Sequence, residues 1–139
     1  MYKFLIILTF TSLFCQYDWQ NNGLPLRQGV HIEWQRTGDY GDNGSMIFAW
    51  SDTRYGGRDV YAQKVDQFGN QLWGSEGVPI VLAPGRQEDP ILVTDGNGGA
   101  YVIWVDYRDE PDNGDIYGQH INSDGVISWN IEGVILTNV

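Results

Sequence analysis

A stretch of about forty residues that occurs twice is the feature that most constrains the fold of this chain. Residues 43–80 and 97–136 share uncommon residue types in the same order. The matched pairs are Trp50 and Trp104, Asp52 and Asp106, and Arg54 and Arg108 at one constant offset, then, after a two-residue insertion, Asp59 and Asp115, Tyr61 and Tyr117, Gln63 and Gln119, Gly69 and Gly125, Trp73 and Trp129, Gly77 and Gly133, and Val78 and Val134 at a correspondingly larger offset. A period near fifty residues indicates a propeller or a solenoid array.

A third, partial copy precedes these two. The segment "WQNNGLPL" (19–26) matches "WGSEGVPI" (73–80) and "WNIEGVIL" (129–136) at the same two offsets. We therefore interpret residues 19–26 as a repeat tail, about 27–82 as a first blade and about 83–139 as a second blade.

Each full repeat is predicted to contain four strands. The apolar runs "MIFAW" and "AYVIWV" are typical of strands buried on both faces, and "DVYAQKV" and "DIYGQHI" follow them. The segment from Trp to Val or Ile is expected to form an outer strand. Upstream, "VHIEWQR" and "DPILVTD" are expected to form the first strands, although these two do not register well on each other. The predicted fold is all-β, with β-propeller-like four-stranded antiparallel blades in a meander.

The N-terminus is predicted to be a signal peptide spanning residues 1–15. Lys3 precedes an apolar run that is too short to span a bilayer as a helix. Cys15 either precedes the cleavage site or is the acylated cysteine of a lipoprotein. We expect a secreted, cell-surface or periplasmic product without a transmembrane segment. No cysteine follows residue 15, so no disulfide is expected.

The charge of the expected mature chain argues against a nucleic-acid partner. Seven of the eight basic side chains remain once Lys3 is set aside, against eighteen acidic ones, which gives a net charge of −11. Such a chain repels phosphate backbones and anionic membrane surfaces.

The repeated Trp, Asp, Arg and Tyr side chains are the candidate site. An Asp and an Arg two positions apart on an extended chain point the same way. One interpretation is structural: each Arg braces neighbouring turns, with Asp59 and Asp115 as expected partners. The other interpretation is a ligand site for a sugar or carboxylate. Its residues are Trp50, Asp52, Arg54, Tyr61, Trp104, Asp106, Arg108 and Tyr117. We favour the structural role, because residues that recur in every repeat usually build the repeat itself.

No catalytic residue, cofactor or metal site is predicted. The acidic segment 109–115 does not have EF-hand spacing, and only His31 and His120 are present to bind zinc. The chain contains no G-x-S-x-G motif and no phosphate-binding glycine-rich loop before a helix.

The pattern W-x-D-x-R…D-[VI]-Y-x-Q…G-x-x-x-W-x-x-x-G-V resembles the repeats of uncharacterised secreted bacterial β-propeller proteins. The resemblance covers nearly all of residues 19–139 and implies a blade architecture, without implying an activity. Closed propellers have about four to eight blades, so two blades are expected to need neighbours.

We expect those neighbouring blades to come from a longer chain of which this sequence is a fragment, or from copies of this chain. The leading functional hypothesis is an exported, non-enzymatic module for protein or surface interaction. A lectin-like propeller assembled from several chains and a fragment of a sialidase-like glycoside hydrolase are the alternatives.

Overall fold

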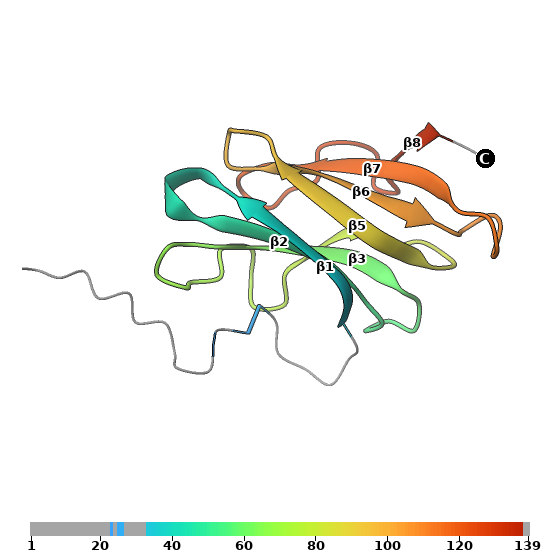
Figure 1. The fold of residues 1–139 in the computed structure, drawn as a ribbon, viewed down its shortest axis with the longest axis horizontal. Coiled ribbons are helices and arrows are strands. Elements are labelled where there is room, and N and C mark those ends of the chain that lie inside the picture. The colour runs from blue at the N-terminus through green and yellow to red at the C-terminus, as the bar shows by residue number, and fades with distance from the viewer. Residues whose placement is uncertain (1–22, 24, 27–32, 138–139) are drawn as a thin grey trace, which may run out of the picture.

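The computed structural model describes residues 23, 25–26 and 33–137, and these residues form an all-β fold. The predicted signal peptide, and Trp19 of the repeat tail, lie outside them. Figure 1 shows how the strands are arranged, and a short 3-10 turn, η1, also lies among the described residues. Their bounds are β1 (Glu33–Tyr40), η1 (Asp42–Gly44), β2 (Met46–Asp52), β3 (Asp59–Val65), β4 (Val78–Val81), β5 (Gln87–Thr94), β6 (Ala100–Asp106), β7 (Asp115–Ile121) and β8 (Val134–Thr137).

The strands form two antiparallel sheets of four strands each, with orders β1-β2-β3-β4 and β5-β6-β7-β8. Each strand pairs with the next along the chain, which is the predicted meander. The strand lengths are the same in both sheets, at eight, seven, seven and four residues. The predicted all-β class and the two four-stranded antiparallel sheets are thus confirmed.

The first strand of each sheet contains a bulge, and this feature corrects the expected register. β5 begins and ends at the same offset from β1 that separates Trp104 from Trp50. Pairing with the second strand shifts between Trp34 and Arg36 in one sheet and between Glu88 and Ile91 in the other. Gln35 and Asp89, which are separated by that same offset, both have positive φ, at 43° and 51°. The two strands therefore do register on each other, with an extra residue bulged out at the same place.

The outer strands are shorter than predicted. Continuous ladder pairing with the third strand covers the four residues of β4 and of β8, and an isolated bridge joins Gln71 to Val65 and Ile127 to Ile121 earlier in each outer segment. Trp73 lies outside β4, and its backbone N–H donates to the side-chain Oε1 of Gln63 on β3, at 3.0 Å, rather than to a backbone carbonyl of that strand. Trp129 likewise lies outside β8, with Gln119 Oε1 as the acceptor at 3.0 Å.

Side chains alternate between the two faces of each sheet, and we name these faces by β2 and β6. Face a carries Ile47 and Ala49 in the first sheet and the equivalent Tyr101 and Ile103 in the second. Face b carries Met46, Phe48 and Trp50 in the first sheet and Ala100, Val102 and Trp104 in the second. Cross-strand pairing places Ala62 and Lys64 on face a of the first sheet, and Gly118 and His120 on face a of the second.

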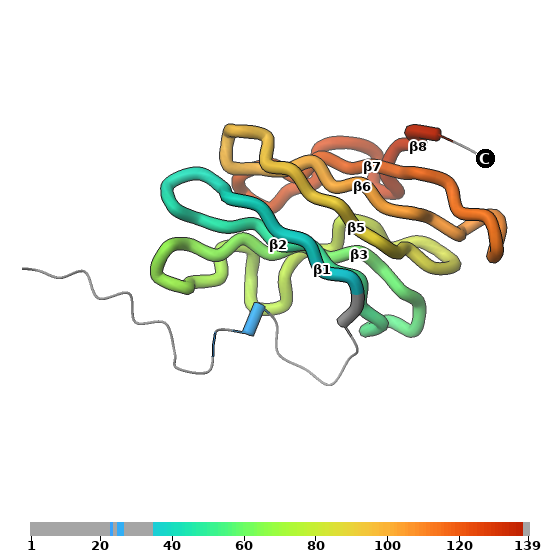
Figure 2. The backbone as a smooth tube through the Cα atoms, in the orientation of Figure 1, coloured from blue at the N-terminus to red at the C-terminus, as the bar shows by residue number. Residues whose placement is uncertain are grey.

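The hydrophobic core lies between face a of the first sheet and face b of the second. Its buried residues are Ile47, Ala49, Val60, Ala62, Ile80 and Val81 from the first sheet and Leu92, Ala100, Val102, Trp104 and Ile121 from the second, with Trp73 between them. β5 lies against β1 and β2 at this joint, as the path of the chain in Figure 2 shows. The predicted burial of both faces is therefore wrong for β6, because Tyr101 on its face a is 44% exposed.

The described residues include no helix of the length and apolarity that a bilayer span requires.

Candidate functional site

The predicted site residues of the first sheet form one cluster at the end of β2. The carboxylate of Asp52 accepts hydrogen bonds from Trp50 Nε1 at 3.0 Å, and from the backbone N and Nε of Arg54 at 3.0 and 2.9 Å. The Arg54 guanidinium lies 3.6 Å above the ring of Tyr61 and donates from Nη1 to the carbonyl of Glu76 at 2.9 Å. The chain turns after β2, which brings Arg54 back onto Asp52 at the end of that strand and over Tyr61 of β3.

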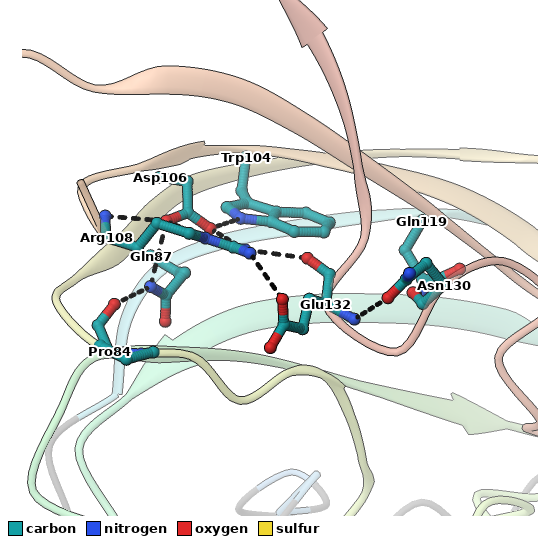
Figure 3. Close-up of polar contacts among 8 residues, drawn as sticks. All are labelled: Pro84, Gln87, Trp104, Asp106, Arg108, Gln119, Asn130 and Glu132. Carbon is teal, nitrogen blue, oxygen red and sulfur yellow. Dashed lines mark hydrogen bonds and ion pairs between the residues drawn. The ribbon is translucent and has the colours of Figure 1, made fainter.

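The second sheet repeats this arrangement at the end of β6 (Figure 3). Asp106 accepts from Trp104 Nε1 at 2.8 Å and from Nε and Nη2 of Arg108 at 2.9 and 2.6 Å. Arg108 Nη2 also donates to the carbonyl of Glu132 at 2.8 Å, and its guanidinium lies 4.1 Å from the ring centroid of Tyr117. Gln87 Nε2 also donates to Asp106, at 3.3 Å.

Two matched glycines make room for the tryptophan rings. Gly77 and Gly133 adopt φ values of +70° and +81°, and a Cβ there would lie 2.8 Å and 2.6 Å from the Cη2 atoms of Trp50 and Trp104. Each ring therefore packs on backbone that only glycine can provide. The shared Gly residues of the repeat thus belong to the same construction as the shared Trp, Asp and Arg.

Burial and hydrogen bonding oppose each other at the two carboxylates. Burial raises the pKa of Asp52, but hydrogen bonds from Arg54 and Trp50 outweigh it, so the pKa lies below its ordinary value. The pKa of Asp106 is lowered by the same balance, with Arg108 and Trp104 as donors. Both carboxylates are therefore held ionised, and each is held by residues of its own repeat.

The expected partnership of Arg54 with Asp59 needs correction. The carboxylate that receives the fork of Arg54 is Asp52, two residues earlier in the chain. Arg108 likewise bonds Asp106. Burial raises the pKa of Asp59, and a hydrogen bond from the backbone of Ala83 together with the charge of Arg54 offsets this only in part. The Arg and the Asp at i and i−2 pair because the chain leaves the strand between them.

The structure brings all eight predicted residues together, four in each sheet, and it buries most of them. Trp50, Asp52, Tyr61, Trp104 and Asp106 are buried, and the side chains of Arg54 and Arg108 are 8% and 12% exposed. The hydroxyl of Tyr61 is buried without a hydrogen-bond partner, and burial raises its pKa. The cluster braces the turn after β2 or β6 to the segment before the outer strand. A ligand-binding role for these residues stays a prediction.

Sequence reasoning missed the role of the matched glutamines Gln63 and Gln119. Oε1 of Gln63 accepts the backbone N–H groups of Lys64 and Trp73, both at 3.0 Å. Oε1 of Gln119 accepts those of His120 and Trp129, at 3.1 and 3.0 Å. Their recurrence at matched positions of the repeat was a usable signal, because a buried amide that recurs must be satisfied in each copy.

A second missed feature is a basic side chain on β3 and β7 that reaches a hairpin turn. Lys64 Nζ lies 2.6 Å from Asp42 Oδ1 and donates to the carbonyl of Gly98, in the other sheet, at 2.8 Å. At the equivalent position His120 Nε2 lies 2.7 Å from Asp95 Oδ2. The sequence concealed this equivalence because the two positions differ in residue type.

An apolar groove lies on face b of the first sheet, and Trp50 of the buried cluster is one of its lining residues. Its volume is about 600 Å³, and its lining includes Pro25, Leu26, Gly38, Met46 and Phe48. In the part of the chain that the structure describes, no three His, Cys, Asp or Glu side chains are grouped so as to hold a metal ion.

Comparison with known proteins adds no relative: no family model, curated protein or solved structure matches the chain.

Proposed function

We propose that this chain is an exported, non-enzymatic β-propeller module that serves protein or surface interaction. Its two sheets are, in this proposal, two blades of a ring that needs further blades, delivered by a longer chain or by other chains. The predicted signal peptide at residues 1–15 directs its export.

The observation that carries the proposal is the direction in which the two sheets are stacked. Face a of the first sheet packs on face b of the second, so the joint is formed by two different surfaces. A head-to-tail joint of this kind leaves one face a and one face b for further sheets, and successive joints form a ring when their rotation closes. A sandwich of two sheets that was complete in itself would have no use for two further apolar faces.

The construction of the repeated clusters supports a structural use for the most distinctive residues. The Asp52 and Asp106 carboxylates and the Arg54 and Arg108 guanidiniums bond one another and nearby carbonyls. A catalytic carboxylate pair acts on a bound substrate from an accessible position. These two carboxylates are instead buried, and their pKa values are lowered by local donors.

The test of the propeller is a tandem fusion, in which two or three copies of residues 16–139 are joined in one polypeptide. Electron microscopy of the fusion is expected to show ring-shaped particles with sheets arranged radially around an axis. Beads of separate two-sheet units would refute the propeller. The non-enzymatic part is checked by incubating the purified chain with a panel of glycosides. Turnover that disappears when one accessible carboxylate is changed to its amide would contradict it.

A carbohydrate-binding propeller is the second candidate, and exposed aromatic rings favour it. Tyr101 and Trp129 are 44% and 41% exposed, with ring centroids 5.9 Å apart and His120 beside them. Aromatic faces of this kind can stack on sugar rings. Glycan-array binding that is lost in Trp129→Ala and kept in Tyr55→Ala would favour a lectin over a protein- or surface-interaction module. Trp104 is unsuitable for this test because it lies in the core.

A further inference from the structure

Matched positions in the two sheets differ sharply in exposure on face a. Ile47 is fully buried, whereas the equivalent Tyr101 is 44% exposed. Ile80 is fully buried, whereas the equivalent Leu136 is 53% exposed. The first member of each pair is covered by the second sheet, and no described residue covers the second member in that way. Face a of the second sheet therefore exposes the apolar positions that, in the first sheet, pack against a neighbouring sheet.

The complementary surface is face b of the first sheet. In the second sheet the face b residues Leu92, Ala100 and Val102 are buried in the joint. Their equivalents in the first sheet are Gly38, Met46 and Phe48, and these line the groove of about 600 Å³. The chain thus presents both halves of the joint that it forms internally, one half on each outer side.

The internal joint also shows how the outer edge is fastened. Trp73 is 4% exposed, donates from Nε1 to the carbonyl of Ser123 at 3.0 Å, and packs against Gly125 of the other sheet. Trp129 is the equivalent residue of the second sheet and is 41% exposed. The turn equivalent to the one that contains Ser123 and Gly125 is that of residues 66–70 in the first sheet.

We infer that a second copy of this chain docks on face a of the second sheet through face b of its own first sheet. In this arrangement Trp129 of one copy approaches the 66–70 turn of the next, as Trp73 approaches the 122–126 turn within the chain. This inference rests on the proposed propeller, and it names the source of the missing blades. A ring of four to eight blades then corresponds to about two to four copies.

The chemistry of the two surfaces favours a like partner. The residues of β6 and β7 on face a of the second sheet are Tyr101, Ile103, Val105, Ile116, Gly118 and His120, none of which is acidic. Two copies of a chain with an expected net charge of −11 repel each other at long range. A contact between them therefore has to gain its stability from apolar burial. Association is accordingly expected to tighten when salt screens the repulsion.

The segment before β1 sets a further condition on docking. Pro25 and Leu26 line the groove, and their carbonyl oxygens accept hydrogen bonds from Gln71, both at 2.9 Å. In the repeat, Pro25 and Leu26 correspond to Ile135 and Leu136. They therefore occupy the place next to the groove that β8 of a docking copy would take, and the two segments compete for it. A chain that begins at residue 27 is therefore expected to associate more tightly than the chain that begins at residue 16.

The experiment uses two variants that each disable one half of the joint. Leu136→Glu places a charge on face a of the second sheet, and Phe48→Glu places one in the groove of face b. Tyr55→Glu, at a residue 76% exposed and outside both faces, is the matched control. Circular dichroism checks that each variant keeps the wild-type fold, and sedimentation velocity measures the masses.

Wild type and Tyr55→Glu are expected to sediment as an assembly of about two to four chains. Each single-face variant is expected to associate about tenfold more weakly or worse, because an unpaired charge would be buried. An equimolar mixture of Leu136→Glu and Phe48→Glu is expected to form a heterodimer and nothing larger, since one intact joint remains. Wild type that stays monomeric at high salt overturns the inference, and so does a mixture in which no heterodimer forms. If the tandem fusion forms rings but the single chain sediments as a monomer, only the docking of separate copies is refuted. If the fusion forms separate two-sheet units, the propeller itself is refuted.

Discussion

Removal of the Arg54 side chain is the sharpest perturbation of the bracing cluster. The guanidinium donates to both oxygens of Asp52, stacks on Tyr61 and reaches the carbonyl of Glu76. Asp52 is fully buried, so Arg54→Ala takes the guanidinium away from a carboxylate in the interior, which keeps its hydrogen bonds from Trp50 Nε1 and from the backbone N of residue 54. Glu76 is exposed, and water can replace the lost bond to its carbonyl.

The magnitude follows from the cost of an uncompensated buried charge. Removing one partner of a buried ion pair costs about 3–5 kcal/mol. The free energy of unfolding of a domain is about 5–15 kcal/mol, so Arg54→Ala is expected to remove a large part of it. Arg54→Lys keeps the positive charge but loses the forked pair of hydrogen bonds to Asp52. Its free energy of unfolding is expected to lie between those of the wild type and Arg54→Ala. Arg86→Ala is the control, because that side chain is 48% exposed and its ion pair is worth about 1 kcal/mol or less.

Urea unfolding followed by tryptophan fluorescence measures this difference, and its pH dependence identifies the cause. In the wild type the pKa of Asp52 is lowered, so its stabilising contribution is present above the unfolded pKa of about 3.9 and is lost as pH falls through the folded value. In Arg54→Ala burial dominates and raises that pKa. The deficit is therefore expected to be largest near pH 7 and to shrink towards pH 4.

A loss below about 1 kcal/mol at pH 7 would refute the bracing role. It would instead favour a ligand-binding role for Arg54, in which the side chain contributes little to the stability of the free protein. A large loss that does not change with pH would show that packing on Tyr61, rather than the charge of Asp52, dominates.

Four further substitutions, of which Trp129→Ala is the matched comparison for Trp73→Ala, probe the joint between the sheets, each by urea unfolding in dilute protein. Trp73→Ala is expected to lower the free energy of unfolding by about 3–5 kcal/mol because the ring is buried. Trp129→Ala, at a residue that is 41% exposed, is expected to lower it by about 1 kcal/mol or less. Equal losses in the two variants would contradict the conclusion that the matched positions differ in burial. Gly125→Ala places a Cβ 2.7 Å from Trp73 Cδ1 at a φ of +78°, so a loss above about 1 kcal/mol is expected, and an unchanged stability would refute the close contact. Lys64→Met removes the ion pair with Asp42 and is expected to cost about 1–2 kcal/mol; a gain in stability would show that desolvation of the ammonium outweighs its bonds.

The third strand of each sheet could be predicted to the residue because several sequence signals coincide in it. "DVYAQKV" and "DIYGQHI" are β3 and β7 as the structure has them, and each sheet has its strands in the predicted order. The first strands could not be aligned, because the residues around Gln35 and Asp89 have little in common. Their equivalence is a property of the backbone, in which both residues adopt positive φ at a bulge.

The predictions of the outer strands and of the Arg partners were wrong for a related reason. In both places side chains form hydrogen bonds that the strand pattern alone does not reveal. The side-chain Oε1 of Gln63 accepts the N–H of Trp73 in place of a backbone carbonyl of β3, which interrupts the regular ladder there. At the site, the alternation rule placed Asp52 and Arg54 on one side of an extended chain. The turn after Asp52 folds Arg54 onto it, and this pairing depends on a chain reversal that spacing alone does not reveal.

The pattern of apolar residues on the outer faces is itself a reason to expect neighbouring sheets. At a position that always faced water, a polar residue would cost the fold little. Tyr101, Leu136 and Trp129 are nevertheless apolar or aromatic, and each is the counterpart of a residue in the internal joint. Met46 and Phe48 present the same situation on the opposite side, in the groove. Since faces a and b differ, neither can pair with a copy of itself in the geometry of that joint. The partner that satisfies both is a sheet of the same kind in the same orientation, and this holds whether it comes from a longer chain or from a second copy.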